Sequence, residues 1–296
     1  MSVKLVHTHE RIFGPQLIAT AITSFMYGLA VLLTGYYFKT KSSKDPLYIQ
    51  LLLGAMLVPA TLQIVFTTHQ SYFDLIINIE SVQRDLRGRE LTFSVPGKFI
   101  CVYVTTFLAQ CFFAVHIWTI ASRVSSRLRF FVIPVVLTAL LQLVAGSIQA
   151  HLQVTSPTFR ILGSTGPILV PVTAIQASAT AGCDLIITTA LCLIYLKYSG
   201  SAFFESGMPI AITKLAVFAI HRAAATSICA ILSILLYYLQ SGSNRFVIPC
   251  LMTGQLYLIS VVSVLLSDES LRGTSKNQDK SETGSITKEC SLVASV

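Results

Sequence analysis

Charged residues are scarce in this chain of 296 residues: Asp, Glu, Lys and Arg make up 11% of it, whereas soluble domains carry about 25%. This scarcity argues against a soluble globular domain. Hydrophobic residues make up 53% of the chain, and the mean hydropathy is +0.71. The apolar runs are each about 20 residues long, which is the length that crosses a bilayer as a helix. The sequence therefore predicts an all-α fold, a polytopic membrane protein built as a seven-transmembrane-helix bundle.

The predicted bundle covers residues 15–267 and follows an extracytoplasmic head of residues 1–14. No small-residue cleavage pattern follows the first run, which therefore reads as an uncleaved helix and not as a signal peptide. Residues 268–296 are polar and rich in Ser and Thr, which is typical of a disordered tail. The predicted spans are about 15–38, 47–68, 99–121, 130–150, 168–196, 210–239 and 246–266.

Disulfide, metal and glycosylation signals are also missing. No cysteine lies in a predicted outer link, so a disulfide framework is not expected. The histidines show none of the His and Cys spacings that bind zinc, so the sequence predicts no metal and no cofactor. No Asn-x-Ser/Thr acceptor occurs in the chain.

The small pair Ala145-Gly146 favours a close contact with a neighbouring helix.

The distribution of Lys and Arg along the chain predicts its topology. The net charge is +8, but the basic residues lie in the links between spans, which argues against a nucleic-acid partner and for the lipid bilayer. More of them lie in the links around 39–46, 122–129 and 197–214 and in the tail than on the opposite side. The positive-inside rule then places the amino terminus outside and residues 268–296 in the cytosol, where partners could bind. Which membrane holds the protein stays open.

Only two full charges lie inside the apolar runs, Asp184 in the fifth span and Arg222 in the sixth, where Lys214 belongs to the polar opening turn. A lone charge in hydrocarbon costs roughly 2.5–3.5 kcal/mol on insertion scales, so such residues pair or mark a functional site. From the helical rise, the two lie within about 8 Å of each other in height, close to the reach of an Arg side chain. We expect a direct or water-bridged pair, unless Arg222 extends to the cytosolic interface instead.

Polar residues in or beside the spans complete the candidate site. Two interpretations stay open: a structural polar core that fixes helix register, or a binding site for a ligand. Histidines in spans are more often hydrogen-bonded packing residues than ligands, and glutamines more often join helices than bind a ligand. The candidate residues are Asp184, Arg222, His221, Gln110, His116 and His69.

Several short motifs occur in an order that resembles a known family. They are Phe13-Gly14-Pro15, Thr67-Thr68-His69, Gln110-x-Phe112-Phe113-Ala114-x-His116-Ile117-Trp118, Asp184 with Ile186-Ile187-Thr188, His221-Arg222 with Thr226-Ser227-Ile228, and Tyr257. Over roughly residues 13–272 the chain is similar to the seven-span membrane proteins of mushroom-forming fungi catalogued as domain of unknown function 6534. The resemblance implies the architecture and carries no established activity.

Three function classes fit this architecture. A receptor-like sensor of a small apolar ligand held between helices is favoured by the small residues of spans five and six. The marks of G-protein-coupled receptors are absent, as is a span-seven lysine for retinal. A transporter or channel for a small solute is the first alternative. A membrane-embedded enzyme acting on a lipid or isoprenoid is the second, although Asp184 is the only carboxyl in the predicted spans.

Overall fold

The structure is a computed structural model, and it describes residues 3–40, 45–77, 91–124, 126–156, 166–199, 208–239, 245 and 247–266. These residues form seven long helices and no strand. The labelled helices are α1 (Val3–Thr40), α2 (Leu47–Tyr72), α4 (Ser94–Val124), α5 (Val132–Thr155), α7 (Gly166–Ser199) and α8 (Met208–Leu239). The last helix spans Val247–Leu266. A π-helical turn, η1 (Phe73–Ile77), extends α2, and a 3-10 turn, η2 (Ser126–Phe131), precedes α5.

Six of these helices are long and apolar enough to cross a membrane, which confirms the polytopic helical bundle. The seventh, α8, is 32 residues long and contains a shorter apolar stretch, Ile220–Ser233. Several helices extend past the predicted spans. The first helix begins at Val3, inside the predicted head, and α2 with η1 continues to Ile77. The predicted tail, 268–296, lies outside the described residues.

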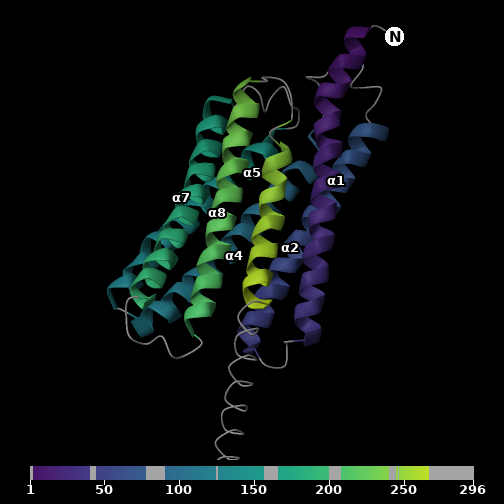
Figure 1. Cartoon of the computed structure of the whole chain (residues 1–296). Coiled ribbons are helices and arrows are strands. Elements are labelled where there is room, and N and C mark those ends of the chain that lie inside the picture. The colour runs from purple at the N-terminus through teal and green to yellow at the C-terminus, as the bar shows by residue number, and fades with distance from the viewer. Residues whose placement is uncertain are drawn as a thin grey trace, which may run out of the picture.

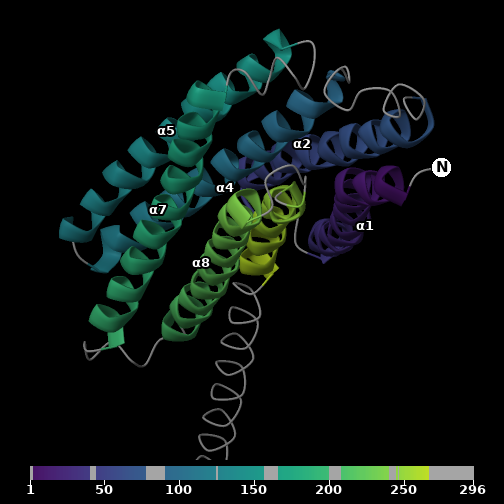
Figure 2. The same ribbon diagram turned by 90° about the horizontal axis from the view of Figure 1, so that it is seen from above.

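The helices run up and down in chain order (Figure 1). We call the end that holds the start of α1 the head end and the opposite end the tail end. Consecutive helices from α1 to α8 pack against each other, and α4 also packs against α7. Seen from above, α1 and α7 lie on opposite sides and the last helix lies between α8 and α1 (Figure 2). Helix α4 is the most buried of the candidate spans, so its side chains reach most of the others.

Glycines permit the closest helix contacts. A Cβ on Gly146 of α5 would lie 2.5 Å from the ring of Tyr103 on α4, which no real side chain tolerates. The prediction of a close contact at Ala145-Gly146 is therefore confirmed. On the last helix, a Cβ on Gly254 would lie 2.9 Å from Oε1 of Gln63 on α2. Small residues let helix backbones approach in a membrane, where apolar surface gains nothing by leaving lipid.

The buried core changes character along the bundle axis. On α2 the buried residues from the tail end are Leu53, Met56, Pro59 and Ala60, followed towards the head end by Gln63, Thr67, Gln70, Ser71 and Asp74. Helix α5 repeats this order, with Val135 and Ala139 before Gln142, Gln149 and Gln153. Before and including Gln110, helix α4 buries the polar residues Ser94, Lys98, Thr105 and Thr106 beside an apolar cluster that contains Phe99 and Val102, and after it the buried residues are apolar: Phe112, Phe113, Ile117 and Ala121. We call these two regions the polar head half and the apolar tail half.

At the tail end, η2 turns the chain from α4 into α5. The guanidinium of Arg129 lies 5.5 Å from the ring centroid of Trp118, and its Nη2 donates to the carbonyl of Ser122 at 3.3 Å. Trp118 is the only tryptophan of the chain and is half exposed. These contacts tie the end of α4 to the following turn.

Candidate functional site

A polar cluster lies where the head half meets the tail half, near the middle of α7 and α8. Nη2 of Arg222 lies 3.0 Å from Oδ1 of Asp184, and both side chains are fully buried. Oδ2 of Asp184 accepts hydrogen bonds from the hydroxyls of Thr226 at 2.7 Å and Tyr257 at 2.6 Å. We call these residues, together with Phe113, the Asp184 cluster. It joins α4, α7, α8 and the last helix, and it confirms the predicted pairing of Asp184 with Arg222.

The position of Thr226 follows from helix geometry. Residues four apart share a helix face, so Arg222 and Thr226 of α8 both point at α7, where Asp184 lies. The last helix supplies Tyr257, whose ring is buried and whose hydroxyl needs a partner in a water-poor interior. The sequence reasoning left Thr226 and Tyr257 out of the candidate site. The four-residue spacing from Arg222 was the signal that could have found Thr226.

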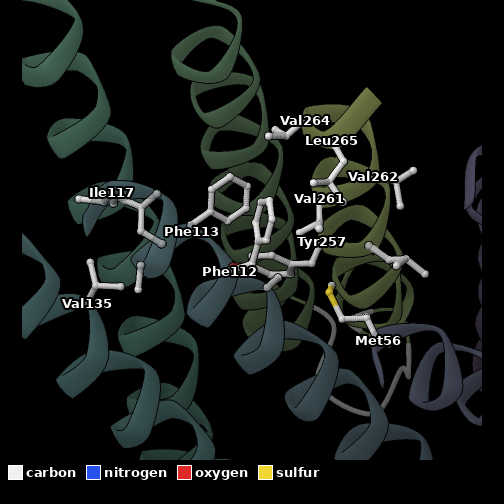
Figure 3. Close-up of a cluster of buried hydrophobic side chains, with 14 of the residues drawn as sticks. Met56, Phe112, Phe113, Ile117, Val135, Tyr257, Val261, Val262, Val264 and Leu265 are labelled. Atoms are coloured by element: carbon white, nitrogen blue, oxygen red, sulfur yellow. The ribbon is translucent and has the colours of Figure 1, made fainter. Parts of the chain in front are cut away.

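The guanidinium of Arg222 lies over two aromatic rings. Its carbon atom lies 4.1 Å from the ring centroid of Phe113 and 5.3 Å from that of Tyr257. Cation–π contacts of this kind are worth about 2 kcal/mol or more when water is excluded. Figure 3 shows Phe113 and Tyr257 within the apolar cluster between α4 and the last helix. The side chain of Arg222 therefore extends sideways into the bundle and not down to the tail end.

The N–H groups of Arg222 are poorly satisfied. Among the described residues, Nε, Nη1 and Nη2 have no hydrogen-bond partner, and neither does Oδ1 of Asp184. The 3.0 Å contact between Nη2 and Oδ1 is thus a charge contact whose direction does not suit a hydrogen bond. A buried donor without a partner costs about 1–3 kcal/mol, more for a charged group. Such groups call for water or a ligand.

Gln110 also has buried polar atoms without hydrogen-bond partners. It lies on α4 one helical turn towards the head end from Phe113, and its side chain is fully buried. Neither Nε2 nor Oε1 has a hydrogen-bond partner in the part of the chain that the structure describes. A buried amide bears two donors and one acceptor oxygen, so all its hydrogen-bonding capacity is unfilled. Gln110 is therefore one helical turn from Phe113 of the Asp184 cluster. Like Arg222, it has buried polar atoms without hydrogen-bond partners.

The three candidate histidines have contacts of their own. Nδ1 of His69 is 2.7 Å from the hydroxyl of Ser94 at the head end. His221 is exposed, and its Nδ1 is 2.8 Å from the carbonyl of Val217 on its own helix. His116 is partly buried on α4, tilted against the ring of Phe112 at 5.0 Å. The structure brings Asp184 and Arg222 together, with Gln110 one helical turn from Phe113, whereas the hydrogen bonds of His69 and His221 lie elsewhere.

A second polar contact lies on the head side between α2 and the last helix. Nε2 of Gln63 donates to the carbonyl of Leu251 at 2.7 Å, and Nε2 of Gln255 donates to Oε1 of Gln63 at 3.1 Å. The expectation that glutamines in the spans join helices fits these bonds of Gln255 and Gln63. Its Oε1 has no partner among the described residues, so this contact also lacks one hydrogen bond.

The expectation that Asp184 and Arg222 are the only charges within the spans is wrong. Asp74 and Lys98 lie inside the candidate spans Leu47–Ile76 and Ser94–Ser122, and both are buried. Lys98 donates to Oε1 of Gln16 at 3.2 Å, and its Nζ lies 5.3 Å from the ring centroid of Phe99. The prediction failed because α2 and α4 continue beyond their apolar runs. In those extra turns the polar side chains face other helices and not lipid.

The described cysteines are Cys101, Cys111, Cys183, Cys192, Cys229 and Cys250, and all six are free thiols. Within the described ranges, no group of three His, Cys, Asp or Glu side chains could hold a metal ion. The Asp184 cluster offers an ion pair and two hydroxyl groups, and Gln110 beside it offers an amide. Such a set can bind a small molecule by hydrogen bonds.

Residues 180–270 match the sequence model of a family of unknown function, DUF6534. The matched segment contains Asp184, Arg222, Thr226 and Tyr257, and leaves out Phe113 and Gln110. No curated protein and no solved structure matches the chain. The long apolar helices make the chain an integral, multi-pass membrane protein. Its residues 180–270 are similar to a family of unknown function. The fungal origin implied by the resemblance stays a prediction.

Proposed function

We propose that this protein is a receptor-like sensor that binds a small, largely apolar molecule between its helices, beside Arg222 and Gln110. The observation that carries the proposal is the set of buried hydrogen-bonding atoms without partners on these two residues. In a bilayer no bulk water is available to fill them, so a protein that keeps such groups has a use for them. The apolar cluster around Phe113 would hold the remainder of the molecule.

The uneven core supports a sensor over a transporter. The polar side chains of the head half reach down to the Asp184 cluster, and the buried side chains below it are mostly apolar. The described exceptions are Thr34, which bonds the carbonyl of Ala30, and the hydroxyl of Tyr37, which bonds Asp45. A molecule can be recognised from the head side without an exit on the tail side. A transport route would need polar groups on both sides of the midplane.

The Asp184 cluster also offers a way to pass on the binding event. A ligand that draws Arg222 away from Phe113 or Asp184 changes contacts among α4, α7, α8 and the last helix together. Binding shifts a helix arrangement only by the difference in affinity for two states, so the ligand must prefer one arrangement of this cluster. With the predicted topology, the ligand arrives from outside and the partners bind at residues 268–296, which lie outside the described residues.

A purification experiment tests this function. We expect a small apolar molecule to copurify with the full-length wild-type protein and to be detected by mass spectrometry of its organic extract. The Gln110→Leu variant should retain less of it. Gln142→Leu is the matched control, because Gln142 is also a buried glutamine with an unpartnered Oε1. Equal small-molecule content in all three proteins would contradict the proposal.

A transporter or channel is the second candidate. It is favoured by the opposite charges of Asp184 and Arg222 near the middle of the bundle. Flux of a small solute into proteoliposomes, abolished by Gln110→Leu, would favour this candidate over the sensor. The enzyme alternative has less support, because Asp184 already accepts two hydroxyl groups and contacts a guanidinium.

A further inference from the structure

We infer that the ligand is a neutral molecule with a hydrogen-bond-accepting oxygen, such as the carbonyl of an aliphatic ketone, on an apolar frame. The inference rests on the proposed function and names the chemical class that the site fits. It follows from the charge balance at Arg222, from the count of donors and acceptors around it, and from the apolar side chains beside it.

The charge balance excludes ionic ligands. Arg222 and Asp184 are both buried, and at 3.0 Å they already neutralise each other. A carboxylate or an ammonium ion would bring a third charge to a site that holds one of each sign. That charge would stay unpaired where unpaired charges cost roughly 2.5–3.5 kcal/mol even on insertion scales. A neutral molecule enters without this cost.

The donors at the site outnumber the acceptors. A guanidinium carries five N–H groups, and those of Arg222 find no hydrogen-bond partner among the described residues. Gln110 adds an amide with two more N–H groups and one oxygen. On the acceptor side, Oδ2 of Asp184 already receives Thr226 and Tyr257, which leaves Oδ1. The missing group is therefore an acceptor, and an alkane or an amine would not supply it.

The aromatic contacts do not fill the hydrogen-bonding capacity of these donors. Phe113 and Tyr257 lie against the guanidinium of Arg222 at 4.1 and 5.3 Å from its carbon to the ring centroids. The rings carry no nitrogen or oxygen acceptor in these contacts, and Nε, Nη1 and Nη2 of Arg222 have no hydrogen-bond partner among the described residues. Gln110 precedes Phe113 by one turn, about 4.5 Å towards the head end. An oxygen placed on the head side of Arg222 could thus accept from both residues.

The apolar frame of the ligand follows from the neighbours of the cluster. Phe113, Cys183, Ile187 and Tyr257 belong to one buried hydrophobic cluster. Ala179 of α7 and Ala223 of α8 are buried near Asp184 and Arg222 along their helices, and their short side chains occupy little space. The side chains of this hydrophobic cluster would contact the hydrocarbon part of a ligand whose oxygen faces Arg222.

Thermal unfolding of the purified full-length protein in detergent tests the inference with four probes of equal chain length. The probes are methyl heptyl ketone, nonane, nonanoic acid and nonylamine. A ligand that binds only the folded state raises the unfolding midpoint. We expect the ketone at about five times its dissociation constant to raise it by roughly 2–4 °C. Nonane, the acid and the amine should leave it unchanged or lower it.

Two variants tie the shift to the site. Gln110→Leu removes an amide that lacks partners, so its midpoint without ligand should equal or exceed that of the wild type. Its affinity for the ketone should fall about two- to tenfold, the loss of one hydrogen bond. Gln142→Leu should keep the wild-type response to the ketone. A purely structural role for Gln110 would not separate these two variants.

The outcomes distinguish the inference from the function on which it rests. If nonanoic acid or nonylamine shifts the midpoint and Gln110→Leu abolishes that shift, the protein binds a ligand at this site but the class inferred here is wrong. If nonane acts as well as the ketone, or if Gln110→Leu responds like the wild type, the probes only partition into apolar surface and the inference fails. If no probe shifts the midpoint, the inference fails; if, in addition, no small molecule copurifies with the wild type, so does the proposed function.

Discussion

Helix α2 buries Gln63 and Gln70 in the head half of the bundle and Leu53 and Met56 in its tail half. Both halves lie in the same bilayer, where apolar side chains gain little by leaving lipid. The tail half must therefore be held by close packing, whereas the head half combines an apolar cluster around Phe99 and Leu251 with hydrogen bonds that specify which helix faces meet. Under the proposed function, recognition falls to the head half and support to the tail half. Substitutions can test the division.

The largest effect is expected at the boundary between the halves. Asp184→Asn leaves the charge of Arg222 buried without its partner, and breaking a buried ion pair costs about 3–5 kcal/mol. We expect most of the folded, monodisperse protein to disappear in size-exclusion chromatography after extraction. The double variant Asp184→Asn, Arg222→Leu should recover part of it. Normal amounts of folded Asp184→Asn would mean that the pair does not stabilise the bundle.

A smaller loss is expected when one hydroxyl leaves the Asp184 cluster. Tyr257→Phe removes the 2.6 Å hydrogen bond to Oδ2 of Asp184 and keeps the ring beside Arg222. Hydrogen bonds to charged groups contribute about 1.5–3 kcal/mol. The unfolding midpoint in detergent should fall accordingly. Tyr195→Phe is the control, since no hydrogen bond of Tyr195 is seen among the described residues, and a similar fall in both variants would remove Tyr257 from the cluster.

Exchanging polar and apolar residues between the halves tests the division directly. Leu191→Gln places an amide among the fully buried apolar side chains of the tail half and should cost about 1–3 kcal/mol. Gln142→Leu removes an amide with one long bond, 3.4 Å from Nε2 to the carbonyl of Tyr103, and should be close to neutral. Chemical unfolding curves of the two variants measure both values. If the two substitutions cost the same, the halves do not differ in their tolerance of polar groups.

The smallest effect is expected at the head end, between α1 and α2. The hydroxyl of Ser71 lies 2.8 Å from that of Thr20, and such contacts between membrane helices average about 0.6 kcal/mol. Ser71→Ala should lower the midpoint only slightly. Ser147→Ala, which removes an exposed hydroxyl bonded within its own helix, should not lower it at all. A large loss in Ser71→Ala would mean that single hydroxyl contacts dominate the head half.

The sequence predicts the helical bundle well, because long apolar runs have few alternatives in a bilayer. It also predicts the pairing of Asp184 with Arg222, since charges in such runs need partners. It does not predict Tyr257 or Phe113 as their neighbours, because helical period relates residues on one helix and not on different helices. For the same reason, the sequence does not show which buried polar atoms lack a hydrogen-bond partner. It therefore did not separate Gln110 from the histidines.

The ends of the spans were the least predictable feature. Lys98 and Asp74 look like link residues because they follow or precede polar stretches, yet both are buried within helices. A polar residue in the last turns of a span can face either water or another helix, and hydropathy does not distinguish the two. The error hid the polar character of the head half, which begins at these residues.

Trp118 gives this protein an intrinsic optical reporter. It is the only indole in the chain, and the Arg129 guanidinium lies over its ring where α4 leads into η2. Indole emission changes in wavelength and intensity when a nearby cation moves, so unlabelled protein can be followed by fluorescence at the end of α4 remote from Gln110. A rearrangement that crosses the apolar half can thereby be timed without introducing a dye.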